Sequence, residues 1–268
     1  MAYFNSNGVC IPSSSSRTYK YNENQYYKFA DFQVNYESIF NNLLKSRLIS
    51  KLRNKDDFEK KATDILLKIG ENPLYSNVLN GPKIPFIIEG FGNENDLGTE
   101  LENELLPKIK DSFNSKYSEC YFKAILQSDS ELSSSVKITN NSNYEAFINK
   151  CQKDYVIGWY FPTAFMGYDI DSQITRFKEL PEITDLNKCL SGGIEISSSL
   201  ISIPELLINT STYSPILCIT AYQHVDPRLV LIFKSYGPHL EFWCMTQMLT
   251  KGITQVSEQW TGGLTIYN

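Results

Sequence analysis

The sequence predicts an α+β fold with a helix-rich N-terminal half, an extended N-terminal arm and a mixed, β-richer C-terminal half. In the first half, apolar residues recur at three- and four-residue steps, the period of an amphipathic helix. In the second half, apolar runs are separated by the turn-forming dipeptides Asp226-Pro227 and Gly237-Pro238, a pattern typical of strands. We expect residues 31–268 to form a single globular domain, preceded by an arm over residues 1–30.

The arm is predicted from its composition. Asn, Gly and Pro residues are followed by Ser13 to Ser16, and a tyrosine-dense segment then runs from Arg17 to Lys28. A terminus of this kind is usually disordered unless a partner holds it in place. We expect the arm to be exchanged between protomers, so that it docks on a neighbouring copy. The alternative is a disordered tail with a local aromatic cluster.

Helices are predicted from periodicity and from their terminal residues. Apolar residues at helical spacing run from Phe32 to Leu52. A second helix is expected to begin near Asp56, a residue type favoured at helix N-termini, and to end at Gly70. Further helices are predicted over 97–113, 144–152 and 171–180, the last of them ending before Pro181.

Strands are predicted where short apolar runs lie between turn residues. The expected ranges are 83–89, 117–127, 155–161, 216–222, 229–235 and 240–245. The glycine-rich pieces Gly90-Phe91-Gly92 and Gly192-Gly193 are interpreted as loops or tight turns. The first follows a strand and precedes a helix, as a phosphate-binding loop would, but it lacks a third glycine and a Lys-Ser/Thr pair.

The overall composition excludes several classes of protein. Apolar residues make up 42% and charged residues 21% of the chain, which is ordinary for a globular protein. The net charge of -5 argues against a nucleic-acid partner. No apolar run approaches the length of a membrane span, and the N-terminus lacks the pattern of a secretory signal. We therefore expect no nucleic-acid partner, no membrane and synthesis in the cytosol.

No catalytic or metal-binding constellation is visible in the sequence. His224 and His239 are the only histidines, and neither has a second ligand at helical spacing. The cysteines are scattered without a C-x-x-C motif, and we interpret them as buried thiols that could form disulfides once the protein is assembled. The disulfide candidates are Cys10, Cys120, Cys151, Cys189, Cys218 and Cys244. We expect no cofactor, no metal and no enzymatic activity, with an enzyme of unrecognised site as an alternative.

One central segment resembles MPN/JAB domains. Tyr155-Val-Ile-Gly-Trp-Tyr160, followed by a helix that contains Gln173, is similar to the central strand of that family. Active members carry a His-x-His motif just after this strand, whereas this chain has Phe161-Pro162-Thr163. The resemblance implies an intracellular scaffold or assembly subunit, a metal-free MPN-like module without catalytic activity.

The tyrosine-dense segment carries the more specific resemblance. Arg17-Thr18-Tyr19-x-Tyr21-Asn22, followed by Tyr26-Tyr27-Lys28, resembles the N-terminal signature of baculovirus polyhedrins and granulins. Val156-Ile-Gly-Trp159 with Thr175-Arg-Phe177, and Leu231-Ile-Phe-Lys234, are weaker similarities to the same family. The matches cover a small part of the chain, and its middle does not align with the family.

The resemblance implies a structural protein that self-assembles into the crystalline matrix of viral occlusion bodies. Such a matrix lies in the host cell nucleus, encloses virions and dissolves at alkaline pH. Its partners are copies of itself and the virions. Tyrosine suits self-assembly because it combines a large apolar ring with a hydrogen-bonding hydroxyl, and the chain has 17 of them. The candidate assembly contacts are Arg17, Tyr19, Tyr21, Tyr26, Tyr27 and Lys28.

Overall fold

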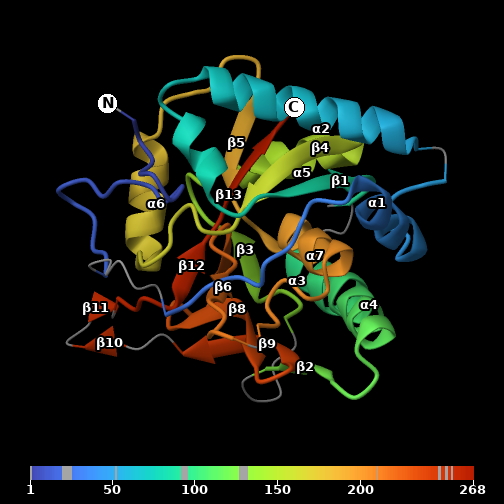
Figure 1. Cartoon of the computed structure of the whole chain (residues 1–268). Helices are drawn as coiled ribbons and strands as arrows, with labels where there is room; N and C mark the ends of the chain where they lie inside the picture. The colour runs from blue at the N-terminus through green and yellow to red at the C-terminus, as the bar shows by residue number, and fades with distance from the viewer. Residues whose placement is uncertain are drawn as a thin grey trace.

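A computed structural model shows helices packed between and around β-sheets (Figure 1). It describes residues 2–19, 26–51, 53–91, 96–126, 132–209, 211–246, 249–250, 253–254 and 256–268, without the side chains of 249, 250, 253 and 254. Helices dominate the first half, and strands are more frequent in the second half. The predicted α+β class, helix-rich first and β-richer later, is therefore confirmed.

Sheet 1 lies at the centre of the protein. Its strands, in spatial order, are β1 (Ile84–Ile88), β4 (Val156–Phe161), β13 (Leu264–Tyr267) and β5 (Asn187–Leu190). All neighbouring strands in it are antiparallel. Every residue of β1, β4 and β13 is buried, because helices cover both faces of the sheet, and such strands appear in the sequence as continuous apolar runs.

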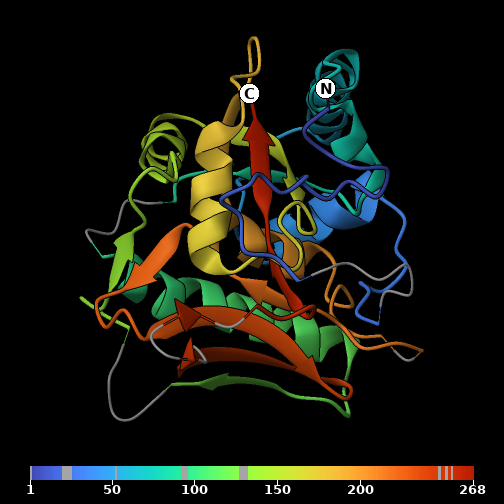
Figure 2. The ribbon, with the colours of Figure 1, turned by 90° about the vertical axis from the view of Figure 1, so that its left-hand side faces the viewer.

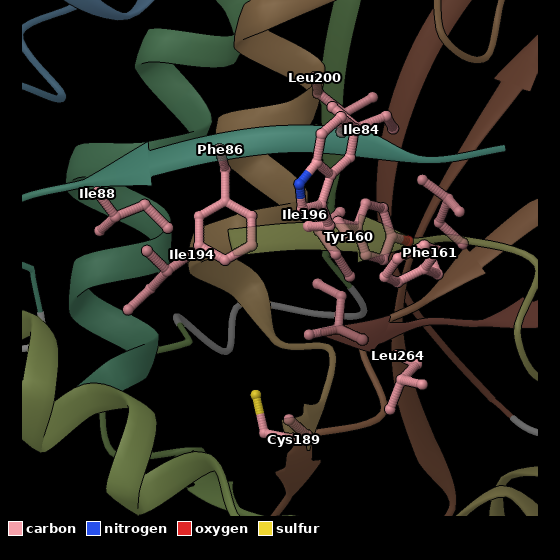
Figure 3. Close-up of a cluster of buried hydrophobic side chains, with 14 of the residues drawn as sticks. Ile84, Phe86, Ile88, Tyr160, Phe161, Cys189, Ile194, Ile196, Leu200 and Leu264 are labelled. Atoms are coloured by element: carbon pink, nitrogen blue, oxygen red, sulfur yellow. The ribbon is translucent and has the colours of Figure 1, made fainter. Parts of the chain in front are cut away.

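Two helices pack on opposite faces of sheet 1. On one face, the indole Nε1 of Trp159 in β4 donates to the carbonyl oxygen of Ala62 in α2 (Lys55–Glu71) at 2.7 Å. On the other face, side chains of β1 point toward α7 (Gly193–Ser202), with Phe86 next to Ile194 (Figure 3). The far side of α7 contacts α1 (Tyr36–Lys45) and α4 (Leu106–Lys116). As a result, every residue of α7 is buried.

Sheet 2 lies below sheet 1 in the view of Figure 1. Its strands, in spatial order, are β12 (Trp260–Gly262), β6 (Ile216–Cys218), β8 (Leu229–Tyr236), β9 (His239–Thr246) and β2 (Phe122–Ile125). The hairpin of β8 and β9 turns at Gly237, whose φ of +58° favours glycine. β2 runs parallel to β9 and forms one edge of the sheet, at the lower edge of Figure 2, while β12 forms the other edge.

The remaining elements connect or flank the two sheets. They are η1 (Ser76–Asn80), α3 (Leu97–Glu100), η2 (Leu101–Leu105), β3 (Val136–Ile138), α5 (Tyr144–Lys153), α6 (Ile170–Glu179), β7 (Tyr222–His224), β10 (Leu249–Thr250) and β11 (Ile253–Thr254). α3, η2 and α4 follow one another without a break, so the helix predicted over 97–113 is present and contains the π-helical turn η2.

Several predicted boundaries are wrong. The helix expected up to Leu52 ends at Lys45, because Arg47 adopts a φ of +58° that breaks the helix; Leu52 itself lies outside the described residues. The second helix is capped by Asn54 rather than Asp56: the Asn54 side chain accepts from the backbone N–H groups of Asp56 and Asp57. The strand expected over 117–127 is limited to β2.

The Gly192-Gly193 pair does not form a tight turn but begins a helix. Gly192 is the N-cap of α7 and Gly193 is its first residue. A side chain on Gly192 would place its Cβ 2.2 Å from Cζ of Tyr144. Glycine is needed here because the Tyr144 ring packs directly against the helix start. Of the other glycine-rich piece, Gly92 lies outside the described residues.

The described part of the arm packs against the body of the same chain. Phe4 and Cys10 are almost fully buried, and the Cys10 N–H donates to the carbonyl oxygen of Ala164 at 2.8 Å. Further along, the Tyr19 N–H donates to Gly167 at 2.8 Å. An arm exchanged between protomers would make the same contacts on a neighbour, so exchange stays a prediction.

Candidate functional site

Exposed aromatic rings gather where the arm joins the domain. Tyr26 and Tyr213 are 63% and 64% exposed, and their rings stack with centroids 5.9 Å apart at an angle of 16°. The ring of Tyr27, which is partly buried, lies 6.0 Å from that of Tyr213. We call Tyr26, Tyr27 and Tyr213 the tyrosine patch. Exposed aromatic side chains in contact with each other are typical of protein–protein contact sites.

Backbone and side-chain hydrogen bonds hold the tyrosine patch in place. The Lys28 N–H donates to the carbonyl oxygen of Tyr213 at 2.8 Å, so the two segments run side by side. The Asn209 side chain donates to Thr212 Oγ1 at 2.6 Å and accepts from the Ser211 N–H at 3.0 Å, which fixes the loop that carries Tyr213. Burial raises the pKa of Tyr27, and the negative charge of Glu258 adds to this effect.

The predicted contact residues fall into two groups. Tyr26, Tyr27 and Lys28 belong to the tyrosine patch or border it. Arg17 lies elsewhere, at the start of α6, where its Nε is 2.7 Å from Oδ2 of the fully buried Asp169. Its backbone N–H also donates to Ser172 Oγ at 2.8 Å.

Arg17 therefore anchors the arm to its own chain. Tyr19, which is 42% exposed, lies beside Gly167. Tyr21 lies outside the described residues.

A second polar cluster is buried at the start of α7. Glu195 is 0% exposed, and its Oε1 accepts from the Gly192 N–H at 2.7 Å and from Thr265 Oγ1 at 2.9 Å. Its Oε2 accepts from the Tyr144 hydroxyl at 2.7 Å. The hydroxyl of Ser191 lies 2.8 Å from that of Thr265. The cluster thus links α5, α7 and β13.

Burial determines the protonation chemistry of this cluster. It raises the pKa of the Glu195 carboxyl above its ordinary range, although the donors around the carboxyl act in the opposite direction. Burial also raises the pKa of Tyr144 well above its ordinary value, and the nearby Glu195 charge adds to this shift. Since both residues are fully enclosed, the arrangement serves to cap α7 and join it to its neighbours.

The cysteines do not form disulfides within the chain. All six lie among the described residues and are thiols, and every one except Cys120 is buried. Burial raises the pKa of Cys10 to about 11 and that of Cys218 to about 12, and it also raises the pKa of Cys151 and Cys189. The interpretation as buried thiols fits five of the cysteines, whereas Cys120 is partly exposed.

The histidines are engaged in local contacts. His224 Nδ1 accepts from the Asp226 N–H at 2.9 Å, and His239 Nδ1 accepts from the Tyr121 N–H at 3.1 Å. The rings of Tyr121 and His239 stack at 3.8 Å. Within the described ranges, no group of three or more His, Cys, Asp or Glu side chains is placed to hold a metal ion. In the same part of the chain, no helix is long and apolar enough to cross a membrane.

Sequence reasoning missed Tyr213 and Glu195. Tyr213 stands alone in a polar loop, so nothing in its surroundings in the sequence indicates that it lies beside Tyr26. Glu195 carried one usable signal: a Glu three residues after a helix N-cap is the residue type that reaches back to the cap N–H. That signal could be used only if Gly192 had been recognised as a cap.

Comparisons with known proteins found no relative of this chain. No protein-family model, curated protein or solved structure matches this chain.

Proposed function

We propose that this chain is a structural protein that assembles with copies of itself, as the matrix protein of a viral occlusion body does. The observation that carries the proposal is the tyrosine patch, where Tyr26 and Tyr213 expose more than half of their surface while stacked on each other. The similarity of the Arg17–Lys28 segment to the polyhedrin signature supports the same proposal.

The patch is suited to binding a protein surface. Stacking already restricts the rings of Tyr26 and Tyr213, so little conformational entropy remains to be lost on contact. Each ring offers an apolar face, and each hydroxyl can hydrogen-bond to the neighbour. The patch is held by the backbone hydrogen bond of Lys28 and by the side-chain hydrogen bond of Asn209 to Thr212, so it is presented as a rigid feature.

In the proposed assembly the partners are further copies of the chain, and the enclosed cargo is the virion. The place of assembly is the host cell nucleus, and the particle dissolves at alkaline pH. These three statements rest on the resemblance of the arm to polyhedrins, and no chemistry is required of the protein beyond forming contacts.

Two measurements test the proposal. Expression in insect cells should give refractile, detergent-resistant crystals visible by light microscopy. In solution, sedimentation velocity should show association that weakens about tenfold or more when Tyr26 and Tyr213 are both changed to Ala, since buried tyrosines are frequent hot spots.

Tyr236→Ala is the matched control, because Tyr236 is 70% exposed but lies outside the patch on the β8–β9 hairpin. A wild-type protein that stays monomeric at every concentration and forms no particles would contradict the proposal. Capture of one defined partner by that monomer would favour the scaffold alternative.

A further inference from the structure

β2 is one of the two edge strands of sheet 2, and its middle residues Lys123 and Ala124 are exposed. We propose that β2 pairs with β2 of a second copy, antiparallel and about a two-fold axis at Ala124, so that sheet 2 continues across two protomers. This inference rests on the proposed self-assembly and names one of its contacts.

The register of β2 on β9 decides which backbone groups face outward. Phe122 lies opposite Leu240, and the Leu240 N–H donates to the carbonyl oxygen of Tyr121 at 3.1 Å. In a parallel ladder, alternate residues of a strand direct their N–H and C=O groups to the same neighbour. Tyr121 and Lys123 therefore pair with β9, whereas the N–H and C=O groups of Phe122 and Ala124 point to the open edge. An edge of this kind is a template for a further strand.

Charge selects the register of the proposed pair. A two-fold axis at Lys123 would place two lysines directly opposite each other, which is destabilising. An axis at Ala124 places Ala124 opposite its own copy and Lys123 opposite Ile125. It also places Phe122 opposite Leu126, so the outward-facing groups of Phe122 and Ala124 form the hydrogen-bonded pairs of the new ladder.

The side chains permit close approach in this register. Ala124 lies on the axis, and its side chain projects from a face of the sheet, out of the plane in which the two strands would pair. Lys123 projects from a face of the sheet rather than from its edge, and its neighbour across the strands is Glu241. Glu241 also lies 3.8 Å from Lys234. Lys123 is exposed, so its charge can stay in water above the face of the sheet when the edge is covered.

A strand-to-strand contact complements the tyrosine patch. A contact about a two-fold axis joins two copies and is then saturated. A lattice requires at least one more kind of contact, and the patch belongs to the arm and the 209–213 loop rather than to sheet 2. Together the two surfaces allow dimers formed through β2 to be linked into a continuous array.

Ala124→Pro tests the proposal directly. Proline removes the outward N–H of residue 124 and is tolerated in edge strands, while the ladder to β9 does not use that N–H. Ala124→Val is the matched control, because valine keeps the N–H and favours strands. By sedimentation velocity, A124P should raise the dissociation constant of the dimer about tenfold or more, whereas A124V should associate like the wild type. Far-UV circular dichroism checks that both variants are folded.

Hydrogen exchange on the wild type gives a second readout that needs no variant. The amides of Phe122 and Ala124 should become protected as the protein concentration rises, while that of Lys123 is protected throughout. Concentration-independent exchange at Phe122 and Ala124, or an A124P dimer as tight as that of A124V, overturns the inference. If association persists in A124P but is lost in the Tyr26/Tyr213 variant, only the β2 contact fails. A wild type that never associates overturns both proposals.

Discussion

Tyr144 in α5 donates its hydroxyl to Glu195 Oε2 in α7 at 2.7 Å, and both side chains are fully buried. Tyr144→Phe leaves the packing intact but removes one donor from the buried Glu195 carboxyl. We expect the free energy of unfolding to fall by about 1–3 kcal/mol, the usual cost of leaving a buried hydrogen-bonding atom without its partner. Urea denaturation measures it. Tyr236→Phe, at a 70% exposed site, should change it by less than about 0.5 kcal/mol, and equal effects would show that the Tyr144 bond contributes nothing.

The Glu195 carboxyl should make stability depend on pH. Burial raises its pKa above the ordinary 4.5, so the folded protein keeps this proton at pH values where the unfolded chain has released it. Its contribution is therefore complete below that ordinary value and is lost as pH rises through the raised one. In Glu195→Gln the free energy of unfolding should fall less than in the wild type as pH rises above the ordinary carboxyl pKa of 4.5. Identical profiles would show that Glu195 does not titrate in this range.

Buried phenols should make the protomer itself sensitive to alkali. Burial raises the pKa of Tyr75, Tyr144, Tyr160, Tyr168, Tyr222 and Tyr267. Above about pH 10 these phenols ionise in the unfolded chain but not in the folded one, so each costs about 1.4 kcal/mol of stability per pH unit. We expect cooperative unfolding within about two pH units, with tyrosinate absorbance and loss of near-ultraviolet circular dichroism changing together. If these phenols ionise while the near-ultraviolet circular dichroism stays that of the folded protein, the prediction is wrong.

Arg17 should hold the arm on α6. Arg17→Ala deprives the buried Asp169 carboxylate of its charged partner, and we expect a loss of about 1–3 kcal/mol in the free energy of unfolding. The freed arm should also be cleaved faster by chymotrypsin after Tyr19. Arg228→Ala is the control, since Arg228 is 72% exposed in its pair with Asp226, and surface pairs contribute about 0–1 kcal/mol. Unchanged proteolysis in Arg17→Ala would show that other contacts fix the arm.

Elements with one buried face could be predicted from the sequence. α2 and α6 each bury one side and expose the other, so their apolar residues recur at the helical period. α7 was missed because it is buried all round, and its Ile and Ser residues leave no polar face to mark the period. β13 was missed because a four-residue run after a glycine pair gives too weak a signal.

The residues of the candidate site were likewise only partly predictable from the sequence. Tyr26, Tyr27 and Lys28 are adjacent in the sequence, and their composition was enough to single them out. Their neighbour Tyr213 comes from a distant loop, and only the folded chain brings it to Tyr26. Arg17 was singled out as well, but the buried carboxylate that binds it could not be inferred from local sequence.

The segment from Trp260 to Tyr267 belongs to both sheets. It supplies the edge strand β12 to sheet 2 and then, directly after Gly263, the strand β13 that lies between β4 and β5 in sheet 1. In sheet 1, β13 pairs with β4 on one side and with β5 on the other, so displacing the 260–267 segment would disturb both sheets at once. The two sheets should therefore unfold in a single transition. Folding should be slow, because β13 near the C-terminus pairs with β4 and β5, which are far from it in the sequence.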